Sequence, residues 1–199
     1  MKSKVIGITG FKYSGKSTVA SIFRRHWIPT IDLDEICYSV IKPGTAGFNE
    51  LLNYFGTELI DEKGDVDMQR LTLLSCKQSW VKELLDDIIE CELDIFFDKL
   101  KNGLPEYKVD IFCVECSALL NSRLKEHVDK FVFVDSNELI RRERIKKSLS
   151  LPEEIVEKFV KSNSGFNNRG IDFTINNNSS LEELEIQVKE LIPDIIQKV

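Results

Sequence analysis

The sequence predicts an α/β fold in which five parallel strands form a doubly wound sheet. Short apolar runs typical of buried strands alternate along the chain with segments whose apolar residues recur at helical spacing. The first apolar run leads through a glycine-containing turn into a helical segment, which is the order of elements found in parallel sheets. The chain has 199 residues, of which 42% are hydrophobic, so we expect a single packed domain over residues 1–199.

The first part of the chain predicts a β–α–β unit. Residues 4–9 form a short apolar strand, and residues 17–27 follow with apolar side chains in a helical rhythm. Residues 29–32 read as a second strand that ends in an acidic turn. A helix over residues 35–41 comes next, and Lys42-Pro43-Gly44 stops it.

The middle of the chain predicts helices without a strand. The pattern is mostly helical over residues 46–100, with a turn at residues 61–65 and a long amphipathic helix over residues 79–101. This region therefore reads as a helical insertion between the second and third strands of the sheet.

The last part of the chain supplies the three remaining strands. Residues 109–114 and 130–134 are compact apolar runs of the buried parallel kind, separated by a helical segment at residues 119–126. A strand at residues 172–175 and a helix from residue 180 to about residue 198 complete the pattern. These elements bring the expected number of strands to five.

The turn after the first strand matches the P-loop pattern G-x-x-x-x-G-K-[ST], in the run Gly10-Phe11-Lys12-Tyr13-Ser14-Gly15-Lys16-Ser17. The glycines let successive backbone N–H groups point at one anion, and the following helix directs its positive end at the same place. Lys16 then supplies charge to the β and γ phosphates, and the Ser17 hydroxyl is offered to Mg²⁺. We therefore expect the motif residues and Thr18 to bind a nucleoside triphosphate.

Two carboxylates follow the second predicted strand, in Asp32-Leu33-Asp34. Ligands bind at the carboxyl edge of an open parallel sheet, and a carboxylate there accepts the proton of an attacking hydroxyl or holds the water shell of a metal. Asp32 is accordingly a candidate for the metal together with Ser17, and both aspartates are candidates for catalysis. One of them can also cap the helix that follows.

Composition and charge exclude several other classes of function. The net charge is −6 and the basic residues are scattered, which argues against nucleic acid as a partner. One basic run, Arg141-Arg142-Glu143-Arg144-Ile145-Lys146-Lys147, is interpreted as a solvated helix face in preference to a phosphate-facing surface. The sequence has no membrane-length apolar segment and no signal-peptide pattern, so we expect a cytoplasmic protein that does not bind membranes.

Five irregularly spaced cysteines do not suggest disulfides, and Cys113-x-x-Cys116 is interpreted as a buried pair rather than a metal site.

Several further runs resemble the dephospho-coenzyme A kinase family. Besides the P-loop, they are Ile31-Asp32-Leu33-Asp34-Glu35-Ile36, Val40-Ile41-Lys42-Pro43-Gly44, Tyr54-Phe55-Gly56, Leu59-Ile60-Asp61-Glu62-Lys63-Gly64 and Ile171-Asp172-Phe173-Thr174-Ile175-Asn176-Asn177. The resemblance implies a fold like that of P-loop nucleoside monophosphate kinases, with a helical acceptor-binding region at residues 45–101 and a lid at residues 141–169. It also implies transfer of the γ-phosphoryl group of ATP to the ribose 3′-hydroxyl of dephospho-coenzyme A, a small-molecule substrate, in the last step of coenzyme A synthesis.

The resemblance implies roles for individual residues as well. Asp34 becomes the first choice for the base, and Arg144 matches an arginine at the start of the family's lid. Arg169 lies close to another arginine that approaches the nucleotide, and Asn176 and Asn177 fall in a loop on the adenine side. The chain departs from the family pattern at Phe11-Lys12-Tyr13, where small residues are usual, and at Glu115-Cys116-Ser117-Ala118, where the family has an aspartate-proline motif.

Other functions remain open at this point. A deoxynucleoside monophosphate kinase shares the sheet and the chemistry but has a different acceptor. A catalytically impaired ATP-binding regulator of the same fold is a further alternative, although the presence of Lys16, Ser17, Asp32 and Asp34 argues against it. A GTPase is disfavoured because no [NT]-K-x-D element is present. The sequence does not determine the oligomeric state.

Overall fold

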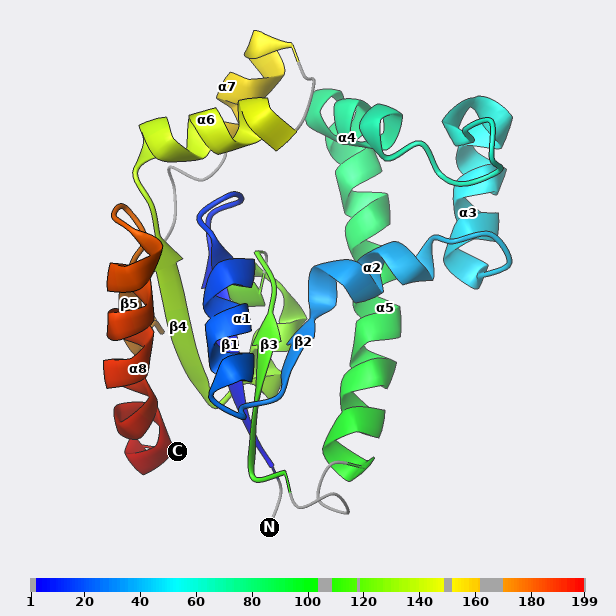
Figure 1. Ribbon diagram of the computed structural model, residues 1–199. Coiled ribbons are helices and arrows are strands. Elements are labelled where there is room, and N and C mark those ends of the chain that lie inside the picture. Colours follow the sequence, from blue (N-terminus) through cyan, green and yellow to red (C-terminus); the bar gives the residue numbers. More distant parts are fainter. Residues whose placement is uncertain (1–2, 104–108, 118, 149–151, 162–169, 199) are drawn as a thin grey trace. The chain divides into compact units, whose positions relative to one another are not determined.

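The computed structural model describes residues 3–103, 109–117, 119–148, 152–161 and 170–198 (Figure 1). These residues fall into two compact units, which are described separately below. One unit comprises Met1–Leu33 and Asp98–Val199 and contains the sheet. The other comprises Asp34–Phe97 and is helical.

The sheet has five parallel strands in the order β2-β3-β1-β4-β5, which confirms the predicted fold class. The strands are β1 (Lys4–Gly10), β2 (Thr30–Asp32), β3 (Ile111–Glu115), β4 (Lys130–Asp135) and β5 (Phe173–Asn176). The long interior strands β1, β3 and β4 are buried almost throughout, as expected for a parallel sheet covered on both faces. The P-loop strand β1 is central, between β3 and β4.

Two helices cover one face of the sheet. Helix α1 (Lys16–Arg25) and helix α8 (Leu181–Lys198) contact each other and lie on the same side of the strands (Figure 1). Apolar side chains of both helices, such as Phe23 and Val188, form one buried cluster with Ile6 and Ile8 of β1. Helix α8 begins where the Ser180 hydroxyl accepts a hydrogen bond from the Glu183 backbone N–H, which satisfies one of the open donors of the first turn.

Two short 3₁₀ helices, η3 (Leu119–Asn121) and η4 (Arg123–His127), pack together, and η3 contacts the opposite face of β1. They correct the expectation of one helical segment at residues 119–126. Ser122 has extended backbone angles, so the chain breaks between the two short turns. A Cβ atom added at Gly7 would lie 2.7 Å from Leu119, so this close approach to β1 depends on glycine.

Helix α6 (Glu138–Ser148) follows β4 and pairs with helix α7 (Glu153–Lys161). Apolar contact between Ile145, Val156 and Val160 holds the two helices together on the inside. Ion pairs link them on the outside, because Arg142 contacts both Glu153 and Glu157. Residues 141–148 of α6 and all of α7 fall within the expected lid region, of which residues 149–151 and 162–169 lie outside the described residues.

The helical unit confirms the sequence expectation for the middle of the chain. Its elements are α2 (Leu33–Val40), α3 (Ala46–Phe55), the 3₁₀ helix η1 (Gly56–Leu59), α4 (Met68–Lys77) and α5 (Ser79–Gly103), of which α5 extends past the end of the unit. Leu51, Leu71 and Val81 from three of these helices share one buried cluster. In the predicted turn, the Asp61 side chain accepts hydrogen bonds from the backbone N–H groups of Lys63 and Asp65, so Asp61 stabilises this turn.

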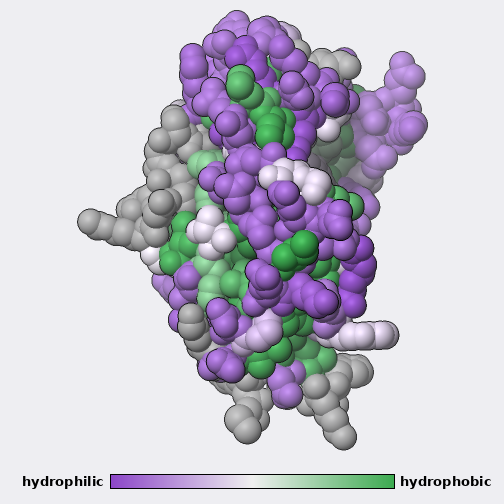
Figure 2. Space-filling model, turned by 60° about the vertical axis from the view of Figure 1, so that its left-hand side comes forward, coloured by the Kyte–Doolittle hydropathy of each residue, from purple (hydrophilic) through white to green (hydrophobic). Residues whose placement is uncertain are grey.

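The surface in Figure 2 is mostly hydrophilic, with hydrophobic residues in separate patches. Exposed apolar side chains of the sheet unit include Leu139 on α6 and Leu181, Ile186 and Ile196 on α8. Among the helices that the structure describes, none combines the length and the apolar character that a membrane crossing requires. Cys113 and Cys116 are buried, as the sequence indicated.

Candidate functional site

The P-loop connects β1 to α1 and is closed by its own backbone. The Ser14 N–H donates to the Phe11 carbonyl at 3.1 Å, and the N–H groups of Thr18 and Val19 donate to the Gly15 carbonyl. Gly10 has a φ of 150°, and a Cβ atom there would lie 2.4 Å from the Val134 carbonyl oxygen. Glycine is therefore required where the loop leaves the sheet beside β4.

Lys16 and Ser17 begin α1, and both side chains are held at the loop. The Lys16 ammonium donates to the Phe11 carbonyl at 3.1 Å, so its positive charge lies against the backbone of the loop. The Ser17 hydroxyl donates to a carboxylate oxygen of Glu115 at 2.5 Å. Charge, helix N-terminus and loop thus converge on one place, which is the arrangement that binds phosphate groups.

Glu115 is a site residue that the sequence analysis did not select. It is the last residue of β3 and only 2% exposed, and it lies beside Ile8 of β1 and Asp32 of β2 in the sheet register. The same signal that selected Asp32, an acidic residue at the carboxyl end of a strand, also applies to Glu115. Burying a carboxylate lowers the stability of the fold unless the group is hydrogen-bonded, and the Ser17 hydroxyl supplies such a bond.

Asp32 closes β2 at the same edge of the sheet and is half-buried. Asp34 is half-buried in the first turn of α2, where a negative charge suits the positive end of the helix. It belongs to the helical unit and stands two residues after Asp32 along the chain. The described residues contain no cluster of three His, Cys, Asp or Glu side chains able to hold a metal ion unaided.

Arg144 and Asn177 hold the loop from outside. The Arg144 Nη1 group donates to the carbonyl oxygens of Tyr13 and Ser14 at 3.2 and 3.1 Å, and lies 3.4 Å from the Ser136 hydroxyl. Partial burial lowers the pKa of Arg144 below its usual value, although a guanidinium stays charged at neutral pH. The Asn177 amide donates to the Ser14 carbonyl at 2.6 Å. The structure thus brings two of the predicted residues onto the P-loop, although they contact its carbonyl side.

Four predicted site residues remain to be placed. Lys12 is exposed, and Thr18 takes part in the first turn of α1. Asn176 is exposed, and its backbone N–H and carbonyl both bond to the Gln187 side chain on α8. Arg169 lies outside the described residues.

The basic run on α6 is only partly a solvated face. Arg142 and Lys146 form exposed ion pairs with α7, as that interpretation requires. Arg141 is 5% exposed, and here the expectation is wrong. Its guanidinium carbon lies 4.3 Å from the centroid of the Phe11 ring, and its Nε–H donates to the Ser136 carbonyl. A cation over an aromatic face is favourable, which explains how an arginine is tolerated there.

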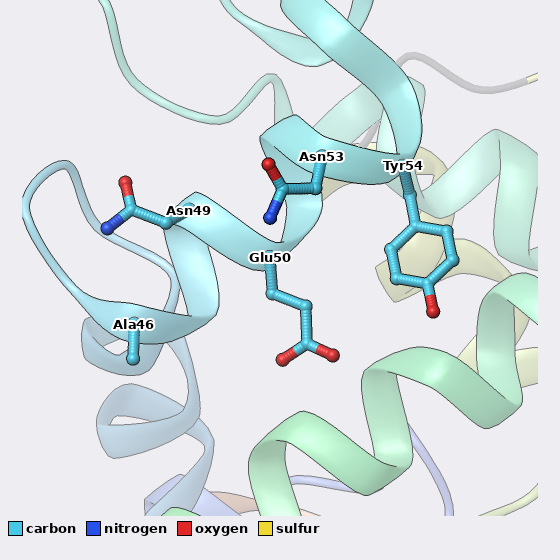
Figure 3. A pocket seen from close by; sticks show the side chains of 5 residues that line it. All are labelled: Ala46, Asn49, Glu50, Asn53 and Tyr54. Atoms are coloured by element: carbon cyan, nitrogen blue, oxygen red, sulfur yellow. The ribbon is translucent and has the colours of Figure 1, made fainter.

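The helical unit has a pocket of about 610 Å³ along α3 (Figure 3). It is lined by Ala46, Asn49, Glu50, Asn53 and Tyr54. Figure 3 shows Glu50 and Tyr54 extending from the same side of the helix. Two carboxamides, a carboxylate and a phenol give the pocket both donors and acceptors of hydrogen bonds.

Comparison with known proteins gives a consistent result. The family described as dephospho-CoA kinase matches residues 4–183. A dephospho-CoA kinase from Listeria monocytogenes is 28% identical over 98% of both chains. Among solved structures, a protein from Thermus thermophilus is similar with a TM-score of 0.75 and 22% identity, covering 98% of each chain. A dephospho-CoA kinase from Campylobacter jejuni has a TM-score of 0.67 and 18% identity, covering 96% of each chain, and at this identity it supports the fold.

Proposed function

This chain belongs to the dephospho-CoA kinase family, and on that premise we propose a mechanism by which its own residues transfer the γ-phosphoryl group of ATP to the ribose 3′-hydroxyl of dephospho-coenzyme A. This reaction is the last step of coenzyme A biosynthesis. The observation that carries the proposal is the P-loop, in which Lys16 lies over the loop and Ser17 is bonded to a buried carboxylate. Family membership favours this function over a deoxynucleoside monophosphate kinase and over a regulator without catalytic activity.

ATP binds, in our proposal, with its β and γ phosphates against the loop amides and Lys16. The Lys16 ammonium exchanges the Phe11 carbonyl for phosphate oxygens, which are stronger acceptors because they are charged. We propose that Asn177 also contributes to nucleotide binding, with Asn176 and Arg169 as further candidates. The support for Asn177 is its bond to the Ser14 carbonyl, which ties the β5–α8 turn to the P-loop.

Mg²⁺ fits the oxygen donors at this edge of the sheet. The Ser17 hydroxyl donates its hydrogen bond to Glu115, so the lone pairs of its oxygen are available to a cation. We propose Ser17 as a direct ligand, with Asp32 and Glu115 accepting hydrogen bonds from the water shell of the ion. The small number of protein ligands agrees with the preference of Mg²⁺ for water and phosphate oxygens. When bound, the ion would neutralise negative charge on the β and γ phosphates.

The acceptor hydroxyl needs a base, and Asp34 is our first choice, with Asp32 as the alternative. A carboxylate accepts the hydroxyl proton as the phosphoryl group moves.

Arg144 is proposed to stabilise the charge spread over the transferring oxygens, because its planar guanidinium can donate to two of them. Residues 45–101 are proposed to bind the acceptor, and the carboxamides of Asn49 and Asn53 suit its amide-bearing arm. The cytoplasmic location also remains a prediction.

The test supplies purified protein with ATP, Mg²⁺ and either dephospho-coenzyme A or a panel of deoxynucleoside monophosphates. Product from dephospho-coenzyme A alone supports the proposal, and turnover of a monophosphate instead would overturn the acceptor assignment. Lys16→Ala should weaken ATP binding. Glu115→Gln should raise the Mg²⁺ concentration for half-maximal rate by about tenfold, since one charged acceptor is lost.

The base is identified by a matched set of variants. Asp34→Asn should lower kcat by about 10²–10⁴-fold and leave ATP binding unchanged. Glu35→Gln, the neighbouring exposed carboxylate on α2, serves as the control and should keep the rate. If Asp32→Asn removes transfer and Asp34→Asn does not, Asp32 is the base.

A further inference from the structure

Two aromatic side chains stand inside the P-loop, at positions that the motif leaves unspecified. Phe11 packs edge-on against Phe133 of β4, with the ring centroids 5.3 Å apart, and its face is covered by Arg141 of α6. Tyr13 packs against the buried cluster of Ile145, Val156 and Val160, which joins α6 to α7. Both aromatic residues therefore connect the phosphate-binding loop to the helices that follow β4.

Tyr13 adopts a backbone conformation that disfavours any residue other than glycine. Its φ is 64°, in the left-handed region, where a Cβ atom crowds the following carbonyl oxygen. Glycine would adopt the same angle without this cost. Since the strain acts against tyrosine, the ring must contribute contacts that offset it, and its packing on the α6–α7 cluster supplies them.

Arg144 contacts the backbone of the same residue. Its Nη1 group donates to the carbonyl oxygen of Tyr13, and Ile145, the next residue of α6, belongs to the buried cluster against which Tyr13 packs. Helix α6 is thus attached to one residue of the loop in two ways, through the Arg144 hydrogen bond to its carbonyl and through the cluster on which its side chain packs. The Arg144 guanidinium is held beside the phosphate-binding turn by the protein's own carbonyl groups.

We propose that Tyr13 is a positioning residue: its ring fixes α6 and α7 against the P-loop and thereby holds the Arg144 guanidinium where the transferring phosphoryl group will lie. The inference rests on the proposed function, in which Arg144 stabilises that group. Charge stabilisation is most effective when the donor is already in place, because little reorganisation accompanies the reaction. Phe11 contributes to the same attachment by stacking with Arg141, three residues earlier on α6.

The kinetic test compares Tyr13→Gly with Tyr13→Phe. Tyr13→Gly relieves the backbone strain and removes the ring, so kcat should fall by about 10–100-fold while equilibrium ATP binding, measured without acceptor, changes less than about threefold. Tyr13→Phe restores the ring and should rescue most of kcat. Leu139→Ala, on the exposed side of α6, is the control and should behave as wild type. Full activity of Tyr13→Gly, equal losses in kcat and ATP affinity, or failure of rescue by phenylalanine would each overturn the proposal.

Two further measurements separate positioning from general damage to the loop. Hydrogen exchange of α6 and α7 in the nucleotide-free protein should be faster in Tyr13→Gly and unchanged in Tyr13→Phe. Adding Tyr13→Gly to Arg144→Ala should lower kcat little further, because both changes act through one guanidinium; additive losses would contradict this. If the wild-type protein fails to phosphorylate dephospho-coenzyme A, the proposed function fails, and the exchange result alone decides whether Tyr13 fixes the helices.

Discussion

Replacing Gly15 by alanine should destabilise the sheet unit through a specific collision. Gly15 has a φ of 96°, and an added Cβ atom would lie 2.0 Å from the Asn177 amide nitrogen. That nitrogen donates to the Ser14 carbonyl, and Asn177 is 6% exposed. The methyl group and the amide cannot both keep their places, so the Asn177 side chain must move and the buried hydrogen bond must break.

The magnitude has two parts. The left-handed backbone angle costs alanine about 1–2 kcal/mol relative to glycine. Loss of the Asn177 hydrogen bond adds about 1 kcal/mol, and not more, because Arg144 also donates to the Ser14 carbonyl and keeps it satisfied. We therefore expect Gly15→Ala to lower the free energy of unfolding by about 2–3 kcal/mol.

Urea denaturation of matched variants measures both parts. Gly170→Ala is the control, because Gly170 belongs to the same unit, has a φ of 91° and has no described atom within 4 Å of an added Cβ atom, so it reports the backbone cost alone. Gly15→Ala should exceed it by about 1 kcal/mol, and this excess should disappear when Asn177→Ala is added. Equal losses for the two glycine variants, or an excess that survives removal of the Asn177 side chain, would refute the collision.

Three other predictions concern stability and titration. Burial raises the pKa of the Cys113 thiol to about 12, so folding opposes its ionisation and the free energy of unfolding should fall as pH rises from about 9 toward 12. Urea denaturation at stepped pH should show a shallower fall for Cys113→Ala than for the wild type. Identical pH dependence of the two proteins would contradict this. Ser180→Ala removes the cap on the Glu183 N–H and should cost about 1 kcal/mol in thermal unfolding, whereas an unchanged midpoint would mean that the cap contributes nothing. The hydrogen bond from Arg142 lowers the pKa of Glu153, so this ion pair stabilises the fold at neutral pH. The stabilisation is lost as pH falls below about 4.5 and through the lowered pKa. NMR titration of Arg142→Ala should show a higher Glu153 pKa, and an unchanged pKa would argue against the pair.

The sequence predicted the sheet well because buried parallel strands have a local signature. All five strands lie within a few residues of their expected positions, and β3 extends to Glu115, one residue beyond the apolar run. The segment at residues 119–126 is helical, as predicted, but is divided into two short elements, because helical spacing over so short a stretch does not distinguish one helix from two 3₁₀ turns. The burial of Arg141 was not predictable either, since its partner Phe11 is far away along the chain.

The sequence by itself determined the phosphate-binding loop, because the P-loop is a local structure whose glycines, lysine and serine act within eight consecutive residues. Only the tertiary structure decided what surrounds it. Glu115 reaches Ser17 across 98 residues of chain, and Asn177 reaches the Ser14 carbonyl across 163 residues. Such contacts follow from the order of strands in the sheet, which brings the ends of β3 and β5 to the same edge as the end of β1. No local pattern records that order, and the surroundings of the loop therefore had to be read from the fold.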